Sequence, residues 1–248
     1  MVNPAGRGAA GRAMPLQLCN AAQMGTRSSH LALANAYDGI TNAVAGLDDG
    51  DLQRATRCRG WLVADLLLHV LCDAQRALVA LASPADGPAT VDAVSYWHSF
   101  PGSTDQGARH TWWARRSAAA FDRPSGVVRL WTDTAPAAVR AAGSADPAGF
   151  VTTQGHVLRV SDLLDTLTTE AVIHHLDLTL DLPAATPPGP AATRVAVATV
   201  DGLLGSAAAR PPGWTDHDYL LKAAGRLALT DPERRDLGEI AARFPVLG

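Results

Sequence analysis

The stretch that decides the fold spans residues 168–178 and reads TTEAVIHHLDL. On an α-helix, side chains four positions apart lie side by side, about 5–6 Å apart at Cβ. Glu170 and His174 therefore share one helical line and can reach a single ion. At about 100° per residue, Asp177 falls on the same line and His175 points well away from it. Because this spacing also occurs in ordinary surface pairs, the flanking residues must decide between the two interpretations.

Apolar rows flank this line on both sides, formed by Leu163, Leu167 and Leu178 on one and by Ile173 and Leu180 on the other. Burying an unpaired carboxylate among such side chains is costly, and a bound cation removes the cost. The flanks therefore favour a divalent metal at Glu170 and His174 over a solvated surface pair.

Composition narrows the class of protein. The chain has 248 residues, of which 47% are hydrophobic, enough for a sizeable core. The formal charge is -3, and no basic cluster is interleaved with aromatic residues, so nucleic acid and anionic membranes are not expected partners. No apolar run approaches the roughly 20 residues that cross a bilayer. The 3 cysteines are widely spaced and favour neither a disulfide framework nor a thiolate zinc site, so a reduced cytoplasm is expected.

Hydrophobic periodicity predicts a mainly α-helical protein. The expected helices cover residues 29–47, 62–82, 111–121, 133–142, 161–182, 191–208, 216–227 and 231–242. Residues 84–110 are rich in Pro, Gly, Asp and Ser and predict a long irregular connection. A short hairpin is expected at 150–160, followed by a helix that Ser161 or Asp162 can cap. This order favours an antiparallel bundle with a minor β element.

Three segments follow from this pattern. Residues 1–28 contain no acidic residue and no contiguous apolar region, and are expected to form a disordered tail. Residues 29–185 are expected to form the bundle, and 186–248, after a Pro-rich linker, a small helical extension.

A bundle assembles metal sites from facing helices, so the pair on one helix needs a partner on another. His69 is the strongest candidate, because it lies in mid-helix among leucine and valine side chains. The alternative for His69 is a buried neutral histidine bonded to a backbone carbonyl. Asp73 and Asp177 are expected to accept from imidazole N–H groups.

Other side chains near these positions receive lesser roles. Cys72 shares the face of His69 but is expected to act as a small hydrophobic residue. The remaining histidines are expected in loops or on other helix faces and are treated as background: His30, His98, His110, His156, His175 and His217.

Two segments carry a resemblance to a known family. GWLVADLLLH at 60–69 resembles the opening of the second helix in the mycothiol-dependent maleylpyruvate isomerase family, a branch of the DinB-like four-helix bundles. EAVIHHLDL at 170–178 is similar to that family's second signature. The resemblance implies a DinB-like bundle in which His69, Glu170 and His174 bind a divalent metal, usually zinc, and leave a position open.

The resemblance also implies a chemistry, in which the metal binds the sulfur of a low-molecular-weight thiol such as mycothiol. The thiolate then attacks a small electrophile, giving isomerisation or S-transfer. Arg76 and Arg226 are hypotheses for contacts with substrate carboxylates. Residues 84–131 match nothing in the family pattern, so the resemblance supports metal–thiol chemistry more firmly than it supports maleylpyruvate.

Two other functions remain open at this point. The metal could serve a thiol-independent hydrolase or lyase that uses metal-bound water, or the bundle could be a non-catalytic scaffold. The oligomeric state is not fixed by the sequence, and a homodimer is one option.

Overall fold

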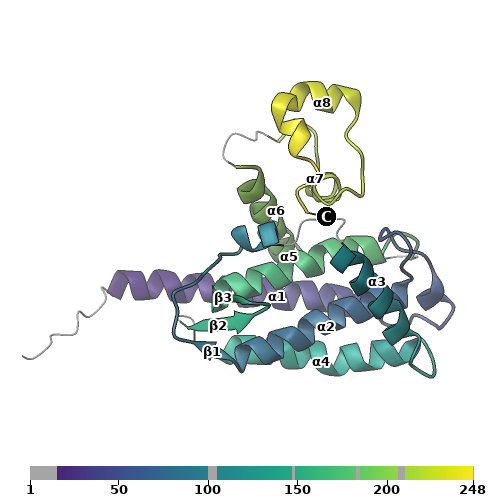
Figure 1. Ribbon diagram of the computed structural model, residues 1–248, viewed down its shortest axis with the longest axis horizontal. Helices are drawn as coiled ribbons and strands as arrows, with labels where there is room; N and C mark the ends of the chain where they lie inside the picture. The colour runs from purple at the N-terminus through teal and green to yellow at the C-terminus, as the bar shows by residue number, and fades with distance from the viewer. Residues whose placement is uncertain (1–15, 100–104, 147–148, 183–184, 206–209, 248) are drawn as a thin grey trace, which may run out of the picture.

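The computed structural model describes residues 16–99, 105–146, 149–182, 185–205 and 210–247 (Figure 1). Helix α1 spans Leu16–Val44 and begins well before the predicted start near residue 29. Residues 16–28 belong to this helix, and the predicted division of the chain into a tail, a bundle and an extension stays a prediction. Residues 1–15 lie outside the described part of the chain.

A four-helix bundle forms the centre of the molecule and confirms the predicted fold class (Figure 1). Its helices are α1, α2 (Val63–Leu81), α4 (Ser125–Ser144) and α5 (Val160–Leu178). Helix α1 packs on α4 and α5, and α2 packs on the same two helices, so the four enclose one core.

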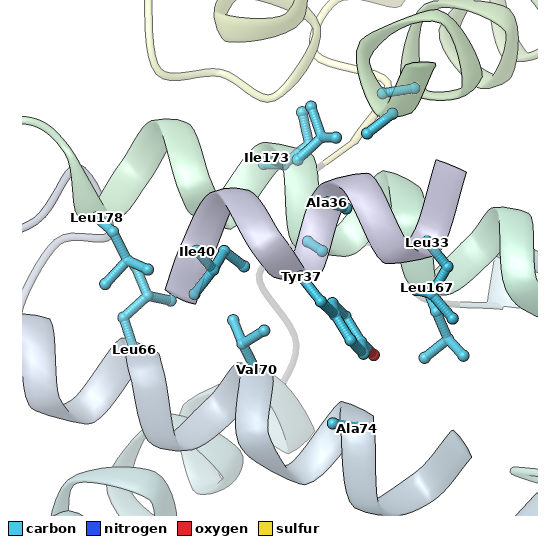
Figure 2. Close-up of a cluster of buried hydrophobic side chains, with 14 of the residues drawn as sticks. Leu33, Ala36, Tyr37, Ile40, Leu66, Val70, Ala74, Leu167, Ile173 and Leu178 are labelled. Carbon is cyan, nitrogen blue, oxygen red and sulfur yellow. The ribbon is translucent and has the colours of Figure 1, made fainter. Parts of the chain in front are cut away.

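The core of the bundle follows from apolar side chains that recur every three or four positions. Leu33 and Ile40 of α1 and Leu66 of α2 are completely buried, and burial of a side chain of this size contributes about 1.5–3 kcal/mol. Figure 2 shows these residues within one cluster of buried side chains, with Tyr37 pointing from α1 towards α2. Tyr37 carries a hydroxyl group into this core, and only 2% of the residue is exposed.

A small antiparallel sheet lies beside the bundle, with strand order β1-β2-β3. Its strands are β1 (Pro84–Ala85), β2 (Phe150–Thr153) and β3 (His156–Arg159), so the hairpin at 150–160 is confirmed. Both central residues of its turn, Gln154 and Gly155, have positive φ values of 47° and 82°, as a type I′ turn requires.

The chain passes directly from this hairpin into the helix that carries the predicted ligands. Helix α5 begins at Val160, and Arg159, with φ -63° and ψ 150°, is its N-cap residue. Ser161 and Asp162 lie inside the first turn, so the prediction that one of them caps the helix is wrong.

The long connection between α2 and α4 contains more helix than the sequence predicts. It includes η2 (Ser95–Ser99) and α3, which spans Asp105–Ala118 rather than starting near residue 111. Helix α3 packs against α2, the helix that carries His69. A short 3-10 helix, η1 (Asp51–Gln53), precedes α2.

The C-terminal part contains α6 (Pro190–Leu204), α7 (Asp216–Ala223), α8 (Asp231–Leu237) and η3 (Gly238–Arg243). Helix α6 packs on α1 and α5, and the main hydrophobic core continues into α6 and α7. A domain boundary at residue 186 therefore stays a prediction. Within the described residues, no helix combines the length and apolar character that a membrane crossing requires.

Candidate metal centre

The structure brings the three predicted ligands together between α2 and α5. His69 Nε2 lies 3.0 Å and His174 Nε2 lies 3.3 Å from Glu170 Oε1. One ligand atom from each of the three residues lies within 4.8 Å of the other two. A divalent ion takes such nitrogen and oxygen ligands at about 2.0–2.2 Å, so the donor types and their spacing fit a three-residue site.

Both imidazoles are oriented through their second nitrogen. His174 Nδ1 lies 3.1 Å from Asp177 Oδ2, and His69 Nδ1 lies 2.9 Å from His110 Nε2. Each bond turns the Nε2 atom of its ring towards Glu170. Such outer partners fix the tautomer and the ring orientation of metal-binding histidines.

His110 corrects two of the sequence predictions. No role in the site is predicted for His110, yet its Nε2 atom contacts His69 Nδ1. This is the contact with the His69 imidazole that was expected for Asp73. The nearest Asp73 oxygen is 3.9 Å from His69 Nε2, too far for a hydrogen bond. His110 lies in α3, in the part of that helix that hydrophobic periodicity did not predict, so no local pattern placed it opposite His69.

The other histidines are separate from the predicted ligands. His175 points away as expected, is buried, and lies with Nε2 2.8 Å from the carbonyl oxygen of Thr186. His30 Nε2 contacts the carbonyl oxygen of Val139 at 3.2 Å. Neither imidazole joins the cluster formed by His69, Glu170 and His174.

Electrostatic coupling in the cluster is strong. Burial alone would raise the pKa of Glu170, but hydrogen bonds with His174 and His69 hold that pKa well below its usual value. Burial alone would lower the pKa of His174, but hydrogen bonds with Asp177, Cys58 and Glu170 hold it well above its usual value. In the metal-free protein, a proton on His174 thus takes the place that a cation would fill.

One flank of the centre, the Asp177 cluster, consists of Cys58, Asp177 and Arg226. Arg226 donates from Nε to Asp177 Oδ1 at 3.1 Å and from Nη2 to Oδ2 at 3.2 Å. Cys58 Sγ lies 3.1 Å from the same Oδ2 atom. No spacing in the sequence singles out Cys58, although it stands two positions before the family-like segment at 60–69.

The opposite flank, the Asp73 cluster, consists of Tyr37, Asp73, Arg76, Tyr96 and Gln154. Arg76 donates from Nη2 to Asp73 Oδ1 at 3.0 Å and from Nη1 to the Tyr96 hydroxyl at 2.8 Å. The side-chain oxygen of Gln154 accepts from both Arg76 and Tyr96. Burial raises the pKa of Tyr96 to about 12 despite the nearby guanidinium, so the hydroxyl keeps its proton.

Aromatic rings line the side of the centre that faces α3. Trp61 meets His69 edge-on at a centroid distance of 5.3 Å, and Trp113 stacks on His110 at 5.6 Å. The three predicted ligands remain partly exposed, with side-chain exposures of 14% for His69, 22% for Glu170 and 12% for His174. A small molecule can therefore approach the cluster.

A mainly helical chain built on a four-helix bundle with a small sheet has the fold class of the DinB-like proteins. The family model described as the mycothiol maleylpyruvate isomerase N-terminal domain matches residues 33–179, more than half of the chain. The chain belongs to the mycothiol maleylpyruvate isomerase family.

A comparison of folds agrees with this assignment. The chain is similar to the crystal structure of a mutant of the mycothiol-dependent maleylpyruvate isomerase, with a TM-score of 0.52 and 15% sequence identity. The similarity covers 84% of this chain and 90% of the other. At this identity the likeness shows a shared fold. No curated protein matches the chain.

Proposed function

We propose that the protein is a metal-dependent enzyme that activates a low-molecular-weight thiol, mycothiol or a close analogue, for reaction with a small electrophile. The reaction is either isomerisation through reversible addition or S-transfer with loss of a leaving group. Family membership supports the thiol. The convergence of His69, Glu170 and His174 on one point is the observation that carries the metal.

In this proposal, His69 Nε2, Glu170 and His174 Nε2 hold a divalent ion, and zinc suits two imidazoles and a carboxylate. Three protein ligands leave a coordination position for a small molecule, as catalytic zinc sites do. A cation held there would favour the thiolate form of a bound thiol at neutral pH.

The residues around the metal centre indicate which side chain can contact the substrate. Asp177 accepts from His174 and Arg226, so it fixes both a predicted ligand and a cationic side chain of the C-terminal part. Each nitrogen of Arg226 already donates to Asp177, to Cys58 or to the backbone of Ala224. Arg76 is therefore the better candidate for a substrate contact.

Metal analysis and a thiol-dependent assay test the proposal together. The full-length protein is purified without chelator, its metal content is measured by mass spectrometry, and loss of maleylpyruvate is followed with and without mycothiol. We expect about one zinc per chain and turnover only with the thiol. Turnover without thiol would instead indicate a hydrolase or lyase, and a metal-free, inactive protein would contradict both enzymatic functions.

Two histidine variants test whether a loss of metal and turnover is specific to the proposed ligands. His69→Ala removes a proposed ligand and is expected to abolish both metal retention and turnover. His217→Ala changes an exposed histidine on α7 and is expected to leave both unchanged.

A further inference from the structure

The Asp73 cluster contains three buried polar atoms whose hydrogen-bonding capacity is unmet. These atoms are the Tyr37 hydroxyl, Asp73 Oδ2 and Arg76 Nε, and none has a hydrogen-bond partner among the residues that the structure describes. An unpaired buried polar group costs about 1–3 kcal/mol, so native proteins rarely keep several together. Two of the three atoms belong to residues in direct contact, Asp73 and Arg76, and together they indicate a binding site for a further polar group.

Asp73 and Arg76 contact each other and adjoin the metal centre, and the charges of both act on the Tyr37 hydroxyl. Arg76 and Asp73 form a 3.0 Å ion pair, and Asp73 Oδ2 is 3.9 Å from His69 Nε2, the nitrogen that faces Glu170. Burial raises the pKa of Tyr37 far above its usual value, and the charge of Asp73 raises it further. Tyr37 therefore keeps its hydroxyl proton.

The chemistry of the guest follows from the unmet donors and acceptors. Arg76 Nε–H can only donate, Asp73 Oδ2 can only accept, and the Tyr37 hydroxyl can do either. A carboxylate guest could satisfy Arg76 but would repel Asp73 and give it no proton. A neutral hydroxyl group accepts from Arg76 and donates to Asp73 at once.

The hairpin turn at Gln154 helps to position Arg76. Gln154 has the positive φ of 47° that a type I′ turn requires. Its side chain bonds Arg76 and Tyr96 and so fixes the guanidinium beside Asp73. The hairpin thus orients Arg76 relative to the metal centre.

We propose that Tyr37, Asp73 and Arg76 form a subsite that binds a neutral hydroxyl group, either an alcohol or the enol of a ketone, of the electrophilic substrate. This proposal rests on the proposed function for the identity of the guest as a substrate. The subsite therefore selects electrophiles that carry a hydroxyl group near the carbon atom that the thiol attacks.

Binding of three unreactive ketones tests the subsite. The zinc-loaded full-length protein is titrated with 1-hydroxybutan-2-one, butan-2-one and 2-oxobutanoate, and the affinities are read from amide shifts in NMR spectra. In these four-carbon 2-oxo compounds, C1 is a hydroxymethyl, a methyl or a carboxylate group, respectively. We expect the hydroxyketone to bind about tenfold more tightly than butan-2-one, the factor that corresponds to about 1.4 kcal/mol.

Two isosteric variants make the test specific. Asp73→Asn can place an N–H donor where the wild type has an acceptor, so it should remove the preference for the hydroxyketone and strengthen 2-oxobutanoate binding. Tyr37→Phe should weaken hydroxyketone binding severalfold and leave butan-2-one unchanged. Far-ultraviolet circular dichroism and metal content verify that each variant is folded and loaded.

The outcomes distinguish this proposal from the proposed function. Equal binding of the hydroxyketone and butan-2-one by the wild type would mean that only water fills the subsite and would overturn the proposal. Variants that change the three affinities by the same factor would overturn it too. Because the probes need no thiol, a failure of thiol-dependent turnover leaves this result unaffected, and an absent subsite leaves thiol activation possible.

Discussion

The Asp177 cluster and the Asp73 cluster flank the same metal centre, and they differ in how fully their polar atoms are bonded. Asp177 is completely buried, and its two carboxylate oxygens contact Arg226, His174 and Cys58. Asp73 contacts Arg76 through one oxygen, while the other has no partner within the described part of the chain.

The difference shows two ways of using a buried carboxylate. A carboxylate whose oxygens are both bonded fixes its neighbours, so Asp177 acts as a rigid support for His174. A carboxylate with one unbonded oxygen retains the capacity to bind something further. The metal centre is thus fully bonded on the side of Arg226 and has free bonding capacity on the side of Arg76, and the following variants test this asymmetry.

The largest effect is expected for His174→Ala. This change removes a proposed metal ligand and also the group that the Asp177 cluster orients. We expect a loss of zinc affinity larger than the roughly 10–100-fold typical of an outer partner, measured by competition with a chromophoric chelator. Full zinc retention by a folded variant would refute the assignment of His174 as a ligand. The two clusters could then not be compared through zinc affinity.

A paired measurement on Asp177→Asn and Asp73→Asn compares the two clusters directly. Asp177→Asn weakens the carboxylate bond to His174 and should lower zinc affinity by roughly 10–100-fold. Asp73→Asn leaves both oriented imidazoles intact and should change zinc affinity by less than about threefold, because it contacts neither Nδ1 atom. Equal losses in the two variants would show that the clusters do not differ in function.

A pH series should reveal the proton that the metal displaces. In the metal-free protein, the pKa of His174 is raised above 6.5 despite burial, through bonds with Asp177, Cys58 and Glu170. Metal ligands must be deprotonated, so zinc affinity should rise by up to about tenfold per pH unit above pH 6.5, until the raised pKa is passed. Chelator competition at several pH values measures the slope, and a flat profile would exclude displacement of this proton.

The same ionisations predict the pH dependence of stability for the metal-free protein. The stability that His174 contributes is complete below its unfolded pKa, near 6.5, and is lost as pH rises through its raised folded value. Glu170, whose pKa is lowered, contributes above about pH 4.5, and that stability is lost as pH falls through its folded value. Asp177→Asn should reduce the His174 contribution, and Asp73→Asn should leave it in place.

Local spacing made the ligand helix predictable. Glu170, His174 and Asp177 lie within two turns of one helix, so periodicity alone aligns them, and the structure has the contacts that this predicts. The hairpin at 150–160 was predictable for the same reason, because its signal is contained in a few consecutive residues. His69 required both its apolar surroundings and the family resemblance.

Contacts between distant segments were not predictable in this way. His110 meets His69 across 41 positions and Cys58 meets Asp177 across 119, and no local pattern encodes such pairs. Asp73 was assigned to His69 because both lie on one helix, whereas α3 in fact provides the closer partner. Periodicity aligns residues on an element, but only packing decides which elements meet.

The smallest effect, and the most direct test of the asymmetry, concerns the stability of Tyr37→Phe. The Tyr37 hydroxyl is buried without a partner among the described residues, and its ring packs edge-on against Trp131 at 5.1 Å. Phenylalanine keeps that packing and removes an unsatisfied group, so the free energy of unfolding should change by less than about 0.5 kcal/mol or increase. Urea denaturation of the wild type and the variant measures the difference. A loss of more than about 1 kcal/mol, the usual value of a satisfied hydrogen bond, would mean that the hydroxyl already has a partner in the free protein, and the Asp73 cluster would then be as fully bonded as the Asp177 cluster.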